Sequence, residues 1–450
     1  MSYPPWHMSE LRGDPSLKYT LPDPLGTPVQ RVPAAPVQDV IGLFLCLAPL
    51  FLVTLRGWSN AILIFGALAS VIFLALGRRG RSLGTPKDQP WMTLAVATLL
   101  SPILAVAISS ALRHSLYWPL FDSPARFCLA IPVLIFAVRT KFDASKFLQF
   151  AFPAALAITL AQQYLVVQPM LWGTTRMATY FADPLVFGYV SMTFGLVTAV
   201  SINLLGKDDR LVVAFKLVGA LAGFYLSIGS GSRTGWMAIP FVVAVWAYQH
   251  RSGKKKIQVA GVVAASSLIS AVIYVTSSTV HPRVDLIFNE IVTYPWTGLA
   301  PDTAVGSRIT FLRMGWDLFF QNPLGGFGDT RFEQFPVSPK IHGFASPIAL
   351  YTAFHSGFHN EIVTNAIRSG IFGLAASMAL FAVPFAVFLG KLKSAHQCTR
   401  ANAVIGITFV ICMFVSSLST EVMDLKYMAS FYALMIALLC GSTLAHHEQG

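Results

Sequence analysis

Apolar runs of roughly 18 residues or more recur along most of this chain and constrain its fold more than any other feature. A helix of that length crosses about 30 Å of hydrocarbon, and it satisfies its own backbone hydrogen bonds where no water is present. The runs do not show the two-residue alternation typical of membrane β-barrel strands. We therefore predict an all-α fold, a polytopic bundle of transmembrane helices.

The runs predict about twelve transmembrane helices. Composition agrees with this, because only 12% of the residues are charged and 55% are hydrophobic. A soluble domain usually carries about twice that charged fraction. The expected spans are 38–55, 58–77, 90–112, 120–138, 147–167, 182–203, 211–229, 233–248, 257–277, 360–390, 402–419 and 428–445.

Basic residues in the connections predict the orientation of these spans. With a cytoplasmic N-terminus, sixteen Lys and Arg residues fall in the inner connections, and the short outer ones hold five, namely Arg56, Arg113, Arg176, Arg233 and Lys426. The positive-inside rule favours this arrangement. The net charge of +12 is then explained by topology, and no nucleic-acid partner is expected.

The chain divides into four predicted parts. Residues 1–37 are rich in proline and form a cytoplasmic tail, and 38–277 hold the first nine spans. Residues 278–358 form a large outer loop whose many Trp and Phe residues argue against a disordered tether, so we expect it to contain short helices. Residues 359–450 hold the last three spans and a short cytoplasmic C-terminus.

Within the outer loop, residues 306–321 have a helical pattern that Asn322-Pro323 should end. We expect one face of this helix to pack on a partner, the face formed by Ile309, Leu312, Trp316 and Phe320. Arg308 lies near that face, whereas Arg313 should point to solvent. The glycine-rich stretch 325–328 supplies a bend whose backbone can closely approach another surface or a ligand.

Ionisable residues in or beside lipid are costly, so each suggests a task. Arg233 stands in a very short outer turn among small residues, where it serves either as an interface anchor or as a ligand-binding group. Arg126 is four residues after Asp122, a spacing that favours a structural ion pair. Lys216 is near the cytoplasmic end of its span, where snorkelling explains it.

His359 precedes the tenth predicted span at the membrane surface. A helix N-terminus and a nearby arginine both disfavour an imidazolium, so the ring should be neutral at pH 7, as a general base requires. An interfacial histidine bound to water is the structural alternative, and His355 is the rival candidate. The outer acidic residues are scattered without metal-ligand spacing, so no metal site is expected. Arginines beside a neutral histidine instead favour an anionic, phosphate-bearing lipid substrate.

At this point the motifs resemble those of the O-antigen ligase and polymerase superfamily of bacterial envelope glycosyltransferases. Together they cover roughly residues 120 to 375, in the order expected of that superfamily. The motifs are Asp122-x3-Arg126, Asp183-Pro184-x2-Phe187-Gly188, the GSGSRTG stretch 229–235, Arg308-x7-Trp316-x5-Asn322 followed by PLGGFG, and His359-Asn360 followed by SGIFG at 369–373.

The resemblance implies an O-antigen ligase of the bacterial inner membrane, with its site facing the periplasm. Such an enzyme transfers a polysaccharide from undecaprenyl diphosphate to a sugar hydroxyl of lipid A–core, without metal or cofactor. Matched by motif, Arg233 and Arg308 hold the diphosphate and His359 deprotonates the acceptor. Supporting candidates are Asn360, Arg176, Arg126 and His355. The implied partners are both substrates and membrane lipids.

Three other functions remain open from the sequence. A polymerase of the same superfamily would use a carrier-linked glycan as acceptor. A polysaccharide or lipid transporter would place its unusual charges near the bilayer midplane, often in repeated halves, whereas here they gather at the outer face. An envelope scaffold would tolerate conservative changes at Arg233, Arg308 and His359.

Overall fold

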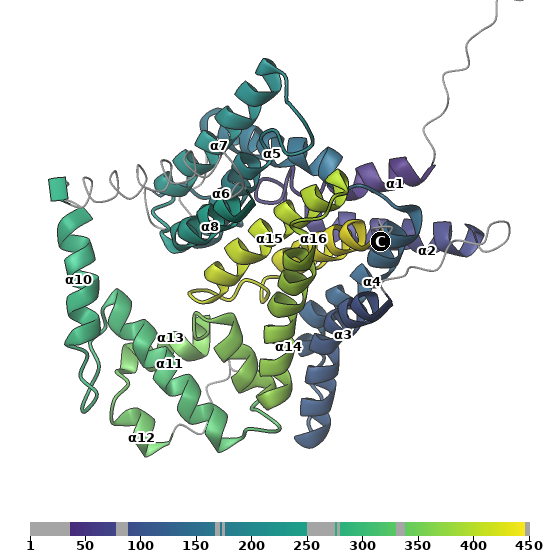
Figure 1. The fold of residues 1–450 in the computed structure, drawn as a ribbon. Coiled ribbons are helices and arrows are strands. Elements are labelled where there is room, and N and C mark those ends of the chain that lie inside the picture. Colours follow the sequence, from purple (N-terminus) through teal and green to yellow (C-terminus); the bar gives the residue numbers. More distant parts are fainter. Residues whose placement is uncertain are drawn as a thin grey trace, which may run out of the picture. The chain divides into compact units, whose positions relative to one another are not determined.

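The computed structural model describes residues 37–77, 89–166, 172, 176–249, 275–276, 280–329 and 338–445, and throughout these ranges the regular secondary structure is helical. The prediction of an all-α fold is confirmed for this part of the chain. The helices labelled in Figure 1 and the two 3-10 helices are α1 (Val37–Cys46), α2 (Trp58–Gly77), α3 (Gln89–Leu112), η1 (Trp118–Phe121), α4 (Asp122–Thr140), α5 (Ser145–Leu165), α6 (Pro184–Val200), α7 (Arg210–Gly229), η2 (Thr234–Ala238), α8 (Ile239–Gln249), α10 (Val280–Val292), α11 (Ala304–Gln321), α12 (Pro339–His342), α13 (Pro347–Ser356), α14 (Glu361–Lys391), α15 (Gln397–Ser417) and α16 (Lys426–Leu444).

Seven helical segments of the described chain are long and apolar enough to cross a membrane, which supports a multi-pass membrane protein. Twelve spans are therefore not confirmed. These seven are α2, α3, η1 with α4, α7, α14, α15 and α16. The predicted orientation and the four-part division of the chain stay predictions.

The other predicted spans differ for identifiable reasons. The run 38–55 is helical only as far as Cys46, and turns with i to i+3 hydrogen bonds follow around Pro49. The helix α5 is long enough but contains several polar residues, and α6 has 17 residues. The span 233–248 begins as the short 3-10 helix η2. Residues 257–277 lie outside the described residues, except 275 and 276.

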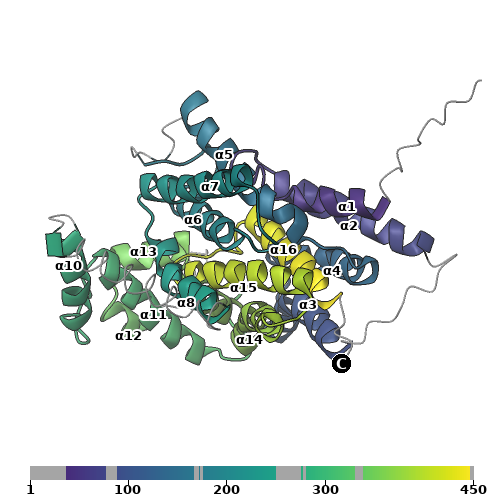
Figure 2. The same ribbon diagram turned by 45° about the horizontal axis from the view of Figure 1, so that its top comes forward.

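The last two helices form the centre of the bundle. Of an 18-residue window in α16, 94% is buried, against 33% in α2, so α16 is enclosed by protein whereas α2 is peripheral. The helix α16 packs on α4, α2 and α15, and α15 packs on α14 and α6. In Figure 2, α15 and α16 lie between α6 and α7 on one side and α3 and α14 on the other.

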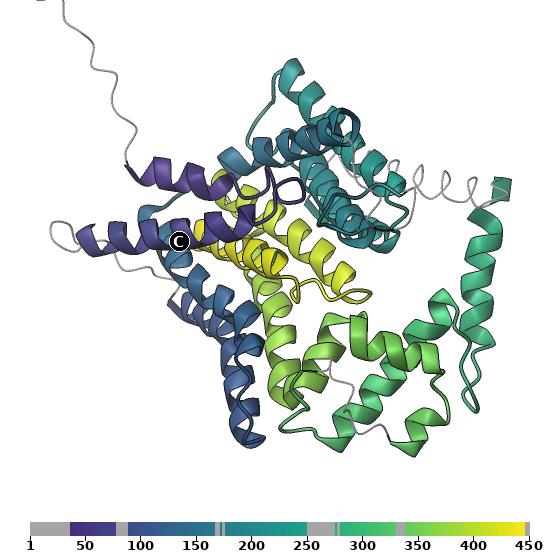
Figure 3. The ribbon, with the colours of Figure 1, turned by 180° about the vertical axis from the view of Figure 1, so that it is seen from behind.

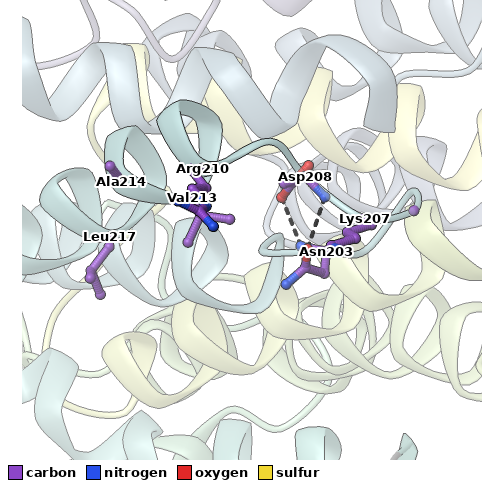
Figure 4. A pocket seen from close by; sticks show the side chains of 8 residues that line it. Asn203, Lys207, Asp208, Arg210, Val213, Ala214 and Leu217 are labelled. Atoms are coloured by element: carbon purple, nitrogen blue, oxygen red, sulfur yellow. Dashed lines mark hydrogen bonds between the residues drawn. The ribbon is translucent and has the colours of Figure 1, made fainter.

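The position of Lys216 corrects the expectation of a snorkelling side chain. Lys216 is fully buried, and its Nζ lies 2.8 Å from the Asp208 carboxylate and 2.7 Å from Oε1 of Gln149. Asp208 and Asn203 also exchange two hydrogen bonds, of 2.8 and 2.9 Å (Figure 4). A buried cation needs such partners, so Lys216 fixes the connection between α6 and α7.

The helix α14 is broken at Ser369 and Gly370, where Gly370 has a φ of +59°. Backbone groups released by such a break need partners, because water is scarce at this depth. The loop segment 323–328 supplies them. The bonds are Phe327 N to Ile367 O (2.8 Å), Gly328 N to Arg368 O (2.9 Å) and Ile371 N to Pro323 O (2.7 Å).

The glycine-rich bend therefore approaches the backbone of α14. A Cβ at Gly326 would lie 2.5 Å from the carbonyl oxygen of Arg368, so only glycine fits there. From the end of α3, the Nη1 atom of Arg113 donates to the carbonyls of Gly325 (2.7 Å) and Arg368 (3.0 Å). Figure 3 shows α11, α12 and α13 gathered beside this end of α14. The bend, α3 and the break thus fix the outer loop on the bundle.

We expect Gly370→Ala to lower the thermal stability of the purified protein. The backbone of Gly370 (φ +59°, ψ −146°) alone disfavours alanine by about 1–3 kcal/mol, and the new Cβ would lie 2.5 Å from the carbonyl oxygen of Leu324. Gly390→Ala, in the same helix, is the matched control, because no atom lies within 4 Å of the added Cβ. Equal melting temperatures for the two variants, measured in detergent, would contradict this role of the break.

Candidate functional site

His359 lies in the connection between α13 and α14, with a left-handed φ of +50°. Its ring packs against Phe311 of α11, with 5.7 Å between ring centroids. Burial lowers the pKa of His359, and the positive charge of Arg308 lowers it further, while Asp183 acts in the opposite direction. The ring is therefore neutral at pH 7, as the sequence predicts, although burial is the larger cause.

Asn360 caps the helix that follows His359. Its Oδ1 accepts hydrogen bonds from the backbone N–H groups of Ile362 and Val363, each at 3.1 Å. Its Nδ2 donates to the carbonyl of Leu418 at 3.2 Å. Asn360 therefore starts α14 and ties the residue next to His359 to the end of α15.

Arg308 stands one helical turn before Phe311 on α11, so its guanidinium reaches the surroundings of His359. The helix begins with Thr303 as its N-cap and ends before Asn322, close to the predicted bounds of 306–321. Arg308 is exposed, and partial desolvation lowers its pKa. It remains a cation at neutral pH.

The buried face of α11 is not the predicted one. The face with Leu312, Trp316 and Phe320 is exposed, these side chains retaining 48%, 66% and 58% of their accessible surface. The opposite face packs inward, through Phe311, Met314 and Leu318. Both faces are apolar, and Gly315 decides between them, because a Cβ there would collide with Val363 of α14. Arg308 lies between the two faces, about 40° from Leu312 and about 60° from Phe311 around the helix, and is itself exposed.

Arg313 also departs from its predicted orientation toward solvent. Its Nη2 donates to the carbonyl of Trp296 at 2.9 Å. Its guanidinium carbon lies 4.0 Å from the centroid of the Phe344 ring, a cation–π contact. Arg313 thus joins parts of the outer loop to each other.

Arg233 lies in the turn between α7 and η2 and is exposed. Small residues bring this turn close to α6, because a Cβ at Gly188 would collide with Ser230 and lie 2.5 Å from the Cβ of Ser232. The Nε of Arg176 donates to the carbonyl of Ser230 at 2.5 Å. The GSGSRTG stretch is therefore a packed turn that presents Arg233 outward, and Arg176 supports it.

The connection between α15 and α16 links the two segments that carry Arg233 and His359. The hydroxyl of Ser419 donates to that of Thr234, at 3.0 Å, beside Arg233. The preceding residue, Leu418, accepts the hydrogen bond from Asn360, beside His359. Two consecutive residues thus contact the neighbours of both candidates, although this connection belongs to none of the sequence motifs.

A buried acidic and basic network lies in and beneath the same connection. Arg368 pairs with Asp424 at 2.8 Å, and Glu361 accepts a 2.8 Å hydrogen bond from the N–H of Met423. Burial raises the pKa of Glu421. The sequence signal was available, because Glu361, Glu421 and Asp424 are ionisable residues at the ends of apolar spans.

Two supporting candidates are held in other contacts. Arg126 pairs with Asp122 at 2.7 Å, as the four-residue spacing predicts, and also donates to Ser430 of α16 at 3.3 Å. His355 stacks on Tyr351 with 3.9 Å between ring centroids, and its Nδ1 lies 2.9 Å from that residue's carbonyl oxygen. Arg126 thus belongs to the contacts between α4 and α16, and His355 to α13.

An open hollow of about 660 Å³ lies at the other end of α7 from Arg233 (Figure 4). Because α7 has 20 residues, roughly 30 Å separates its two ends, so this hollow is not part of the site. It is lined by Asn203, Gly206, Lys207, Asp208, Arg210, Val213, Ala214 and Leu217. In the described ranges, no three His, Cys, Asp or Glu side chains are grouped as metal ligands.

Comparison with known proteins agrees with the motifs. Residues 218–378 match the family model described as O-antigen ligase, and this region contains Arg233, Arg308, His359 and the break in α14. An O-antigen ligase of Salmonella typhimurium is 22% identical over 366 residues, covering 77% of this chain and 81% of that protein. An uncharacterized protein of Haemophilus influenzae is 20% identical over 378 residues, covering 81% and 89%. The resemblance to O-antigen ligases and polymerases is thus confirmed.

Proposed function

We propose that this protein is an O-antigen ligase of the bacterial inner membrane. It would transfer a polysaccharide from undecaprenyl diphosphate to a sugar hydroxyl of lipid A–core, at the periplasmic face, in lipopolysaccharide biosynthesis. The observation that carries the proposal is the half-buried His359 ring, which packs on Phe311 one helical turn from Arg308 and whose pKa is lowered by burial and by that arginine. The hydrogen bonds of Asn360 and Thr234, the sequence neighbours of His359 and Arg233, to the consecutive residues Leu418 and Ser419 support a single site.

In this mechanism His359 acts as general base. Its neutral ring takes the proton from the acceptor hydroxyl as the oxygen attacks the anomeric carbon of the donor sugar. The bond between that carbon and the diphosphate oxygen breaks, and the diphosphate leaves on its lipid carrier. Energy comes from this phosphate ester, so the proposal requires neither metal nor cofactor.

Arg233 and Arg308 would stabilise the leaving diphosphate. A planar guanidinium binds phosphate oxygens through two donors and stays charged, so two arginines can replace a general acid. The guanidinium of Arg233 has no hydrogen bond or ion pair within the described part of the chain, which leaves its donors available. The partly desolvated Arg308 would attract phosphate more strongly than a fully hydrated cation.

A deletion strain complemented with plasmid variants tests the proposed function. We expect the deletion to leave core without polymer and to accumulate carrier-linked polymer, and we expect the unaltered gene to restore transfer. His359→Ala should lower transfer by roughly 10²–10⁴-fold because the base is lost. His355→Ala is the matched control, since this exposed histidine is held within α13. Lipopolysaccharide gels measure the transfer.

Two outcomes would contradict the assignment. Full transfer by inserted His359→Ala would remove the proposed base. A deletion strain whose core carries a single repeat unit would indicate a polymerase, which extends a carrier-linked acceptor, instead of a ligase.

Arg233→Lys should lower transfer at least about tenfold although the charge is kept. Lysine lacks the two-donor fork, and a charge-assisted hydrogen bond contributes roughly 1.5–3 kcal/mol. Arg56→Lys, at another exposed arginine, serves as the control and should leave transfer unchanged. Equal transfer rates for the two variants, measured with purified protein, would exclude Arg233 as a diphosphate ligand.

The pH dependence of kcat/KM tests the contact between Arg308 and His359. The acid limb should have an apparent pKa below 6.5, the ordinary value for histidine, because the imidazole is disfavoured as a cation. Arg308→Gln removes a neighbouring positive charge, which raises the pKa of His359 and moves the limb to higher pH. Arg313→Gln, on the same helix, should not move it. An unmoved limb in Arg308→Gln would contradict the proposed arrangement.

A further inference from the structure

The backbone of His359 adopts a conformation that residues with a side chain rarely occupy. Its φ of +50° lies in the left-handed region, where only a few per cent of non-glycine residues are found. Such a conformation persists where surrounding contacts determine it. The contacts on each side of His359 therefore decide where its ring points.

On the N-terminal side, the contact comes from Glu421. The backbone N–H of Phe358 lies near its carboxylate and acts to lower the pKa of Glu421, against the larger effect of burial. The Glu421 side chain also lies against Gly357, where a Cβ would collide with both carboxylate oxygens, and Gly357 itself has a φ of +85°. The hydroxyl of Thr364, in the first turn of α14, donates to the same carboxylate. Glu421 thus joins the segment before His359 to the helix after it.

On the C-terminal side, the contact comes from the same connection. The carbonyl of Leu418 accepts the hydrogen bond from Asn360 at 3.2 Å. The connection is itself anchored on α14, by the pair between Arg368 and Asp424 and by the hydrogen bond from Met423 N–H to Glu361. Residues 418–424 therefore hold the backbone on both sides of His359.

We propose that Glu421 is a positioning residue that holds His359 in its left-handed conformation, against Phe311 and beside Arg308. This inference rests on the proposed function, because it assumes that His359 is the base. A carboxylate suits the task because one oxygen accepts from the hydroxyl of Thr364 while both oxygens lie against Gly357, two residues before His359. Arg368 attracts the carboxylate, whereas Glu361 and Asp424 add negative charge nearby.

The test uses full-length protein in lipid nanodiscs, with a polyprenyl-diphosphate-linked glycan as donor and lipid A–core as acceptor. We expect Glu421→Ala to lower kcat by roughly 10–100-fold, since a small misplacement of a reacting group has that effect. The KM for the donor should stay within about twofold, because the phosphate ligands are unchanged. The apparent pKa of the acid limb of kcat/KM should rise toward 6.5, because the displaced His359 ring would be more exposed and farther from Arg308.

Two variants separate positioning from general destabilisation. Glu421→Gln keeps the size of the side chain and an oxygen that can accept from the Thr364 hydroxyl, so it should retain more activity than Glu421→Ala. Asp143→Asn is the matched control. Asp143, in the connection between α4 and α5, is a buried carboxylate that accepts from the N–H (3.2 Å) and hydroxyl (2.6 Å) of Ser145, the first residue of α5. This substitution should lower the melting temperature without moving the acid limb.

Each outcome bears on one idea. The positioning role would be overturned if Glu421→Ala left both kcat and the acid limb of the pH profile unchanged. It would also be overturned if Glu421→Ala lowered activity and had a melting temperature like that of Asp143→Asn but left the acid limb unmoved. If Glu421→Ala does not fold, kcat and the acid limb of Glu421→Gln decide. A partial loss of kcat with an upward move of the limb supports the role, and no change in either overturns it. Full activity of His359→Ala would instead overturn the proposed function, whatever Glu421 does.

Discussion

The pairing between the broken helix α14 and the loop segment 323–328 is the interaction on which the rest of the site depends. An interrupted helix near a membrane leaves carbonyl and N–H groups without partners, each costly to bury. Here the loop backbone fills those positions from Ile367 to Ile371. Because α11 ends just before this segment and His359 lies just before α14, the same pairing sets α11 against α14. The contact of Phe311 with His359 follows from it.

Much of the local structure could be predicted from the sequence, because helix ends and short-range pairs depend on neighbouring residues. The helix α11, its end at Asn322 and the pair between Asp122 and Arg126 all agree with prediction. Which face of α11 is buried could not be predicted, since both faces are apolar and the deciding contact is with Val363 of another helix. Lys216 differs for the same reason, because its partner Gln149 is distant in sequence. The number of membrane-spanning helices could not be predicted either, because the length of an apolar run does not reveal where a helix breaks.

In the candidate site, too, local patterns could be read from the sequence whereas contacts between distant residues could not. Arg233, Arg308 and His359 each stand in a local pattern that drew attention to them, and the neutral state of His359 follows from its position. The connection 418–424 carries no comparable pattern, although it contacts the neighbours of two of these residues. Its acidic residues become meaningful only when Arg368 and the backbone of Phe358 are beside them. The residues proposed for chemistry thus stand in local sequence patterns, whereas the residues that contact their neighbours are apparent only in the folded chain.

The two apolar faces of α11 have a consequence for the outer loop as a unit. Its inner face is covered by α13 and α14, while Leu312, Trp316 and Phe320 remain uncovered on the outer face. A fragment containing the loop without α14 would expose part of the inner apolar face of α11 as well as its outer apolar face. Exposed apolar patches of this kind promote aggregation. The loop therefore has a small apolar core of its own, separate from that of the bundle, and α14 completes this core through Ile367 and Val363.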